Sequence, residues 1–207
     1  MKELNGLQTA ELRHRLFSNL QLLQALLAIR LRSVRDPESQ RHLQWLTDVV
    51  TALALINRRL DDRGLSDFGG YLIESVGFWR RVCAGRDIGF SLEADPVALP
   101  ERLASSLALI VHELIANSVE HAFTDGRPGR VALSLSARDG WLTLVVADDG
   151  RGSELGLDQP EAQGMELVRG LAEHLGGEYR TLTDNGFEVT VRVPLEGDVR
   201  RRRKPGH

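Results

Sequence analysis

The sequence lacks the cysteines of disulfide-rich and zinc-binding proteins, the long apolar runs of membrane proteins and the signal peptide of secreted proteins. It has one cysteine, Cys83, so it can form no internal disulfide and has no second thiol for a zinc site. No uninterrupted apolar run reaches the roughly 20 residues that cross a bilayer, and the N-terminus lacks the pattern of a signal peptide. We therefore expect a cytoplasmic protein without membrane insertion, in which Cys83 is a small buried residue.

The folded part of the chain also lacks a surplus of positive charge. The formal net charge of the 207 residues is −3, although residues 200–204 are all Arg or Lys. Nucleic-acid binding needs Lys and Arg spread over a folded face, so we expect no nucleic-acid partner. Residues 197–207 are predicted to form a basic disordered tail, with a docking element as the alternative.

Residues 1–63 predict an antiparallel hairpin of two helices. Leucines recur every three or four residues from Leu16 to Val34 without a proline, which indicates a long amphipathic helix. Asp36 and Pro37 suit the N-cap and first position of a second helix. The apolar stripes are too wide for two helices to bury, so we predict a homodimer that forms a four-helix bundle. Packing against the rest of the chain is the alternative.

Residues 64–196 predict an α+β domain with helices on one face of a largely antiparallel sheet. Helices are expected at 70–84, 100–123 and 165–175, and strands at 88–92, 131–136, 141–147, 178–182 and 187–193. Two turn signals, Asp139-Gly140 and Asp184-Asn185-Gly186, join the last four strands into two hairpins.

Three segments of this domain carry polar groups or glycines that packing alone does not require. Glu113, Asn117, Glu120 and His121 share one helix face, and an Asn inside a helix is best tolerated where its oxygen has a partner such as a metal. Asp148-Asp149-Gly150-Arg151-Gly152 ends an apolar strand and puts a carboxylate beside backbone that a flat ligand can approach. Gln163-Gly164-Met165 opens a helix, whose free N–H groups favour phosphate.

These segments resemble known sequence motifs. Residues 112–121, 148–152 and 164–177 resemble the N box, G1 box and G2 region of the GHKL ATPase superfamily, and of histidine kinases in particular. Residues 11–21 resemble the phosphoacceptor box of histidine kinases with a dimerisation and phosphoacceptor domain of the second type. The resemblance implies a helical phosphoacceptor hairpin followed by an α/β-sandwich GHKL (Bergerat) ATP-binding domain.

The resemblance implies ATP and Mg²⁺ as cofactors and assigns roles by position. It implies that His14 accepts the phosphoryl group, that Asn117 binds Mg²⁺ with support from Glu113, and that Asp148 accepts a hydrogen bond from the adenine amino group. The remaining members of the implied nucleotide site are Gly150, Gly152, Gly164, Met165 and His121.

His14 has some support from the helix pattern itself. It lies about 160° around the helix from Leu16, so its side chain is expected to face solvent. Glu11 lies on the same face and is predicted to hold one ring N–H, with an ordinary surface glutamate as the alternative.

The leading interpretation is a sensor-less protein-histidine kinase of a two-component phosphorelay, which passes its phosphoryl group to an aspartate of a response-regulator receiver domain. An upstream sensor or input protein is expected as a further partner. The family commonly carries Lys where this chain has Glu120, and Lys and Asn at Phe17 and Ser18. The missing sensor and an acidic lid at 153–163 favour a second interpretation, a histidine phosphotransferase with a degenerate ATP site. A third is a GHKL regulatory binder related to anti-sigma factors.

Overall fold

A computed structural model describes residues 2–61, 64–124, 126–151 and 161–195. The chain divides into two compact units, Met1–Tyr71 with Ala98–His112, and Leu72–Val97 with Glu113–His207. The domain limits 1–63, 64–196 and 197–207 stay a prediction. The predicted basic tail and most of the predicted lid lie outside the described residues.

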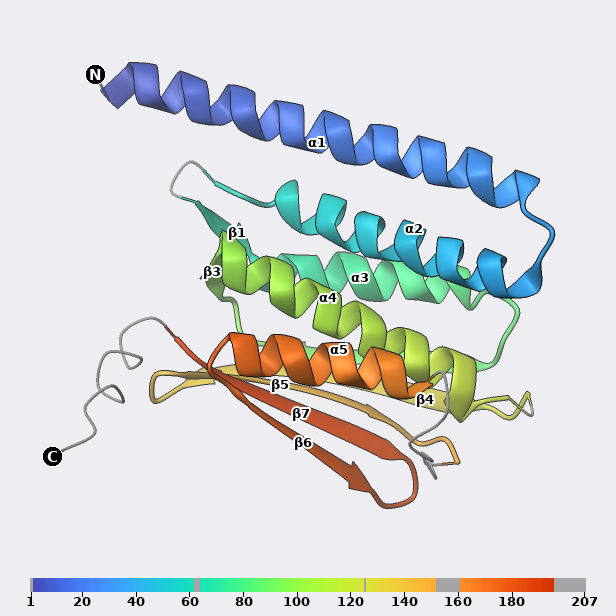
Figure 1. The fold of residues 1–207 in the computed structure, drawn as a ribbon. Coiled ribbons are helices and arrows are strands. Elements are labelled where there is room, and N and C mark those ends of the chain that lie inside the picture. The colour runs from blue at the N-terminus through green and yellow to red at the C-terminus, as the bar shows by residue number, and fades with distance from the viewer. Residues whose placement is uncertain (1, 62–63, 125, 152–160, 196–207) are drawn as a thin grey trace, which may run out of the picture. The chain divides into compact units, whose positions relative to one another are not determined.

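The first unit contains the helical hairpin, formed by α1 (Lys2–Ser33) and α2 (Pro37–Asn57), which run antiparallel (Figure 1). Asp36 is the N-cap of α2, since its Oδ2 accepts a hydrogen bond from the Ser39 N–H at 2.8 Å. Gln24 Nε2 on α1 donates to Thr51 Oγ1 on α2 at 3.0 Å. The predicted hairpin and its cap are therefore confirmed.

The first unit also holds two strands that the sequence pattern does not predict. β1 (Leu65–Asp67) pairs antiparallel with β3 (Ala98–Pro100), and three residues are too few to show a periodicity. Helices α3 (Phe68–Val82) and α4 (Glu101–Asn117) each contribute residues to both units. Within the first unit, Tyr71 Oη donates to the Ala108 carbonyl at 3.1 Å and joins the start of α3 to α4.

The second unit contains a five-stranded sheet in the order β2-β4-β5-β7-β6. Its strands are β2 (Ile88–Ala94), β4 (Gly129–Arg138), β5 (Trp141–Asp148), β6 (Glu178–Thr183) and β7 (Phe187–Pro194). Only the β2–β4 pair is parallel. Asp139 and Gly140 have φ angles of 53° and 76°, which fit the tight turn predicted between β4 and β5.

One face of this sheet forms the core of the second unit. Alternate residues of β4, β5 and β7 are fully or almost fully buried, as the period of two requires. Helix α5 (Glu161–His174) lies against this sheet in Figure 1 and is followed by a turn at Gly176, whose φ of 70° suits a glycine. Cys83 is buried, as predicted. The α+β fold class is confirmed.

The helix expected at 70–84 is Phe68–Val82, and two further differences in helix boundaries affect the candidate site. The helix expected at 100–123 is α-helical only to Asn117 and continues as a π-helix, η1 (Ser118–Ala122). The helix expected to start at Met165 starts at Glu161, so Gly164 lies inside its first turn. Among the described residues, one stretch, 101–122, is apolar and long enough to cross a membrane, but 67% of it is buried in the fold, as in a core helix, so the evidence for a span is weak.

Candidate functional site

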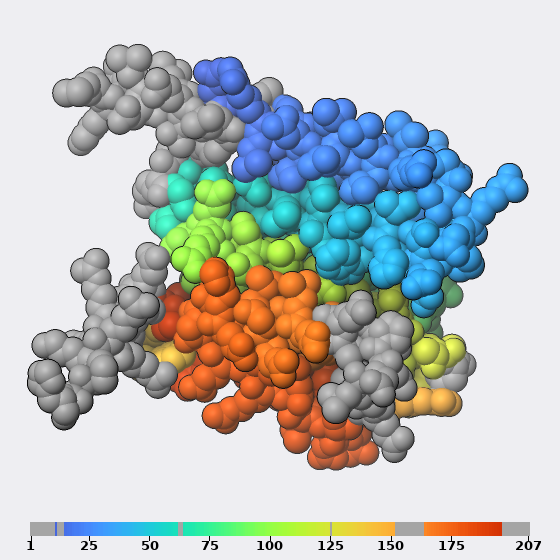
Figure 2. Space-filling model, viewed as in Figure 1, coloured from blue at the N-terminus to red at the C-terminus, as the bar shows by residue number. Residues whose placement is uncertain are grey.

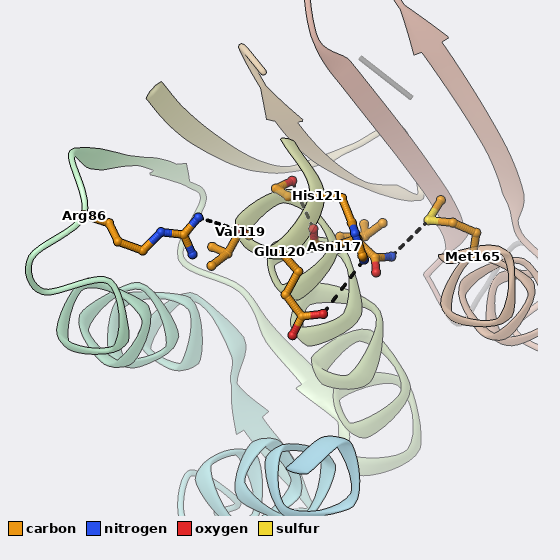
Figure 3. A network of polar contacts seen from close by, with 8 residues as sticks. Arg86, Asn117, Val119, Glu120, His121 and Met165 are labelled. Atoms are coloured by element: carbon orange, nitrogen blue, oxygen red, sulfur yellow. Dashed lines mark hydrogen bonds and ion pairs between the residues drawn. The ribbon is translucent and has the colours of Figure 1, made fainter. Parts of the chain in front are cut away.

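The π-helix η1 is the element around which the candidate site is built. Ser118 Oγ lies 3.1 Å from the Leu114 carbonyl, a side-chain bond that loosens the helix ladder. Arg86 Nη2 donates to the Val119 carbonyl at 2.8 Å (Figure 3) and to the Phe123 carbonyl at 3.4 Å, which provides partners for the widened turn. Single π-turns inside α-helices occur often at functional sites. The sequence pattern does not identify Ser118 or Arg86.

Asp148, at the end of β5, is buried and held by several donors. Its Oδ2 lies 2.9 Å from Ser118 Oγ, and its Oδ1 accepts from the Gly150 N–H at 3.0 Å. The Phe187 N–H on β7 is a third donor. The carboxylate is therefore fixed in orientation by groups from η1, the β5 end and β7.

Burial raises the pKa of Asp148 above its usual value, because desolvation disfavours the charged form. The hydrogen bonds from Ser118, Gly150 and Phe187 oppose this shift, and the charge of Asp149 adds to it. The result is a desolvated acceptor with a defined direction, suited to recognise a polar N–H in a flat apolar ligand.

Two glycines let the backbone close around Asp148. A Cβ on Gly150 would lie 2.4 Å from the Ala122 Cβ and 2.6 Å from the Ala122 carbonyl oxygen, so only glycine fits beside η1. A Cβ on Gly186, in the β6–β7 turn at a φ of 144°, would lie 1.9 Å from the Asp148 carbonyl oxygen. The sequence predicts Gly150 as a site residue, whereas it indicates Gly186 only as part of a turn.

A second cluster brings together Glu113, Asn117, Gly164 and Met165, all predicted site residues. A Cβ on Gly164 would lie 3.1 Å from Glu113 Oε2, 3.3 Å from Asn117 Nδ2 and 3.5 Å from Asn117 Oδ1. Asn117 Nδ2 donates to Met165 Sδ at 3.4 Å (Figure 3). Within the second unit, the end of α4 thus places two oxygen-bearing side chains beside the backbone of a glycine on α5.

His121, the last predicted residue of the N-box segment, lies on η1 and is exposed. Its Nε2 is 3.9 Å from Glu120 Oε2, so an acidic side chain of the same helical segment lies beside it (Figure 3). Asp149, next to Asp148, is exposed, and its Oδ1 accepts from the Arg130 N–H at 2.6 Å. The two adjacent carboxylates therefore have different surroundings.

Three of the predicted residues are not placed with these clusters. His14 lies on α1, but its side chain lies outside the described residues, as does Gly152. Glu11 Oε1 accepts from Arg15 Nη2 at 2.5 Å on the exposed surface of α1. The proposed contact between Glu11 and His14 stays a prediction.

The donor set around Gly164 fits a magnesium ion bound together with a ligand. A carboxylate and an amide oxygen are hard donors that suit Mg²⁺. Within the described residues, no group of three or more His, Cys, Asp or Glu could hold a metal by itself. Mg²⁺ at this place would therefore also need oxygens from phosphate or water, as is usual for Mg²⁺ sites.

These features define an α/β-sandwich domain with a buried, hydrogen-bonded carboxylate at a strand end and an Asn–Glu–Gly cluster at a helix start. A family model described as a histidine kinase-like ATPase domain matches residues 89–193, and one described as histidine kinase matches residues 11–72. The chain belongs to the histidine kinase family. The resemblance of both segments is thereby confirmed.

Individual relatives agree with this assignment. The blue-light-activated histidine kinase 2 of Erythrobacter litoralis is 30% identical over 199 residues, which cover 91% of this chain and 57% of the relative. The sensor histidine kinase PdtaS of Mycolicibacterium smegmatis is 29% identical over 204 residues, which cover 89% of this chain and 39% of the relative. The chain thus spans about half the length of these relatives or less.

Solved structures agree on the fold. A blue-light activated histidine kinase of Erythrobacter litoralis matches with a TM-score of 0.71 at 26% identity, over 91% of this chain and 61% of that chain. Its histidine kinase domain alone matches with a TM-score of 0.66, over 84% of this chain and 96% of that chain.

Proposed function

We propose that the chain is an ATP-dependent protein-histidine kinase of a two-component phosphorelay. The observation that carries this proposal is the buried Asp148 carboxylate, held by Ser118 and two backbone N–H groups beside a glycine that nothing larger can replace. Such a carboxylate accepts a hydrogen bond from one N–H of a planar ring and discriminates against ligands that lack this N–H, because they would leave its buried charge without that partner.

Asp148 is proposed to accept a hydrogen bond from the amino group of adenine. Its ionised form is the acceptor, and Ser118 and the Gly150 N–H keep that form oriented. Gly150 packs against Ala122 of η1 and so fixes the chain beside the carboxylate, and Gly152 is proposed to shape the site of the base. Adenine recognition therefore depends on a negative charge that the protein has largely removed from water.

The cluster around Gly164 is proposed to hold the phosphate end of the nucleotide. Bound Mg²⁺ supplies charge neutralisation and orientation of the phosphates. Asn117 and Glu113 would provide protein oxygens for it, while His121 lies on the same helical segment as a polar neighbour. The missing Lys at position 120 makes this oxygen set more important, since the phosphates have fewer cations near them.

His14 is proposed as the phosphoacceptor. The unprotonated ring nitrogen attacks the γ-phosphorus, a P–N bond forms, and the bond to the β–γ bridging oxygen breaks and releases ADP. Glu11 is proposed to hold the other ring N–H. The phosphoryl group then passes to a carboxylate oxygen of an aspartate in a response-regulator receiver domain, and the imidazole becomes neutral again. An upstream input protein and a cytoplasmic location belong to the same proposal.

A homodimer is proposed because the hairpin leaves large apolar side chains exposed in a single chain. Leu22, Leu26 and Ile29 on α1 are 59%, 54% and 66% exposed, and Trp45 and Leu46 on α2 are also exposed. Figure 2 shows side chains of α1 and α2, in blue to cyan, at the surface of the molecule. Pairing with a second hairpin would bury this surface, as in four-helix bundles.

The adenine role of Asp148 is tested by comparing two adjacent substitutions. Asp148→Asn keeps the shape and removes the charge, and we expect ADP affinity to fall by about 10- to 100-fold, the value of a charge-assisted hydrogen bond. Asp149→Asn removes the neighbouring exposed charge and should change ADP affinity less than about threefold. Isothermal titration calorimetry measures both, and equal losses in the two variants would contradict the proposal.

A relay protein without ATP turnover is the second candidate, favoured by one observation. Glu120 stands where the family has Lys, and its carboxylate lies 3.9 Å from His121, so it lowers the positive charge available to phosphates. A relay protein would gain label on His14 only from a phosphorylated receiver domain. A kinase would gain it from ATP and Mg²⁺ alone.

A further inference from the structure

The amide of Asn117 has a sulfur atom as its hydrogen-bond partner. Asn117 is the last residue of α4, and its Nδ2 donates to Sδ of Met165 on α5 at 3.4 Å (Figure 3). Met165 is only 8% exposed. Asn117 makes no side-chain capping bond to η1, although it occupies the position where such a cap would form.

This contact decides which end of the amide points where. The oxygen and nitrogen of an asparagine side chain have nearly the same shape, so only hydrogen-bond partners select one orientation. A thioether has no proton to donate and can only accept. The sulfur therefore favours the orientation in which Nδ2 faces Met165 and Oδ1 points elsewhere.

The direction of the amide matters because both of its ends border the same space. The Nδ2 and Oδ1 atoms would lie 3.3 and 3.5 Å from a Cβ at Gly164, beside Glu113 Oε2 at 3.1 Å. A flipped amide would present N–H donors where a cation needs an oxygen. One wrong orientation would thus replace attraction for a cation by repulsion.

Methionine suits this task better than other side chains of similar size. A hydroxyl or amide at position 165 both donates and accepts, so it would bind either end of Asn117. A carboxylate would select the same orientation but add a negative charge near the phosphates. Leucine would fill the volume and select nothing.

We propose that Met165 is a positioning residue, whose sulfur orients the Asn117 amide so that Oδ1 is presented to Mg²⁺ bound with the nucleotide. This inference rests on the proposed function. It assigns to Met165 an action on the metal through Asn117, beyond general membership of the nucleotide site.

Norleucine replaces the sulfur of methionine by a CH₂ group at almost constant shape. The chain has two methionines, Met1 and Met165, so among the residues that the structure describes, incorporation of norleucine in place of methionine changes Met165 alone. Selenomethionine incorporation is the matched control, because selenium also accepts and cannot donate. The full chain is used, with ADP and Mn²⁺ as probes, and Mn²⁺ binding is followed by electron paramagnetic resonance.

We expect the norleucine protein to bind Mn²⁺·ADP about three- to tenfold more weakly than the native protein, the range of one lost neutral hydrogen bond. ADP in EDTA, which tests adenine recognition without the metal, should change less than about twofold, and selenomethionine should restore native Mn²⁺·ADP binding. Unchanged Mn²⁺·ADP binding in the norleucine protein, or an equal loss with and without metal, would overturn the inference.

The orientation of the amide can also be measured without nucleotide. The side-chain NH₂ resonances of Asn117, assigned by their absence in Asn117→Asp, should shift in the norleucine protein and return with selenomethionine. No shift would overturn the inference while leaving the proposed function intact. If the resonances shift in the norleucine protein but the native protein binds no nucleotide, the proposed function is refuted, and with it the role toward Mg²⁺.

Discussion

Ser118→Ala should make nucleotide binding more sensitive to acid. The substitution removes the hydroxyl that lies 2.9 Å from Asp148 Oδ2 and leaves the Gly150 and Phe187 N–H donors in place. A hydrogen bond to a charged group contributes about 1.5–3 kcal/mol. The hydroxyl proton is shared with the Leu114 carbonyl at 3.1 Å, so the lower end applies. That value corresponds to about a tenfold increase in the proton affinity of the carboxylate.

The sign of the effect follows from the form of Asp148 that binds. The ionised carboxylate accepts from adenine, and burial raises its pKa, so affinity is full at higher pH and falls as pH drops through that pKa. Loss of Ser118 raises the pKa further. ADP affinity of Ser118→Ala should therefore match the native value at pH 8 and be about tenfold weaker at a pH below both pKa values.

Calorimetric titration with ADP from pH 8 to pH 5 measures this profile. Ser75→Ala is the matched control, because Ser75 is a buried serine of α3 in the same unit and is 4% exposed. Its profile should follow that of the native protein. A Ser118→Ala profile that is native at every pH, or weaker by the same factor at every pH, would refute the assignment of Ser118 as a support of the ionised carboxylate.

Three further predictions concern stability and assembly. Burial lowers the pKa of His112 to about 4, so on acidification the unfolded chain takes up a proton on His112 before the folded protein does, and the free energy of unfolding should fall by about 3 kcal/mol as pH drops from about 6.5 to about 4. Urea unfolding of His112→Phe should show a weaker dependence of this free energy on pH. The same pH dependence in His112→Phe and the native protein would exclude His112 as the cause. Gly150→Ala should lower the free energy of unfolding by about 1–3 kcal/mol, because the added methyl group meets Ala122 of η1. Gly170→Ala on α5, where a Cβ would have nothing within 4 Å, should not lower it. Equal melting temperatures for Gly150→Ala and the native protein would show that a methyl group fits beside η1. Leu26→Glu should weaken the dimer by about tenfold or more in sedimentation equilibrium. Ile73→Glu, the same kind of change at an even more exposed position on α3, should leave the dimer intact. A fully dimeric Leu26→Glu protein would place the interface elsewhere.

The parts of the fold that the sequence predicts are those with local signals. Asp36-Pro37 starts α2, and Asp139-Gly140 forms the β4–β5 turn, because a cap and a tight turn depend on a few consecutive residues. The short strands β1 and β3 escape prediction, since each has three residues and finds its partner more than 30 positions away. The π-helix escapes for a similar reason: its carbonyls are capped by Arg86, which is 33 residues from Val119.

The residues of the candidate site likewise fall into those that the sequence predicts and those that depend on contacts distant in sequence. Glu113, Asn117 and Gly164 are predicted from their spacing and resemblance, and the structure brings them together. Ser118 is missed because a small hydroxyl has no periodic signal, and its contact with Asp148 crosses 30 positions of sequence. The orientation of the Asn117 amide toward Met165 is a property of three-dimensional packing that no sequence pattern carries.

The central claim is that a nucleotide bound beside Asp148 phosphorylates His14. The most direct measurement follows the γ-phosphoryl group of labelled ATP in the presence of Mg²⁺, with peptide mapping of acid-labile phosphate on the native protein, His14→Gln and Asp148→Asn. The account predicts label on the peptide that contains His14 in the native protein, none in His14→Gln, and a strong decrease in Asp148→Asn. Label that persists in His14→Gln, or that is unaffected by Asp148→Asn, would contradict it.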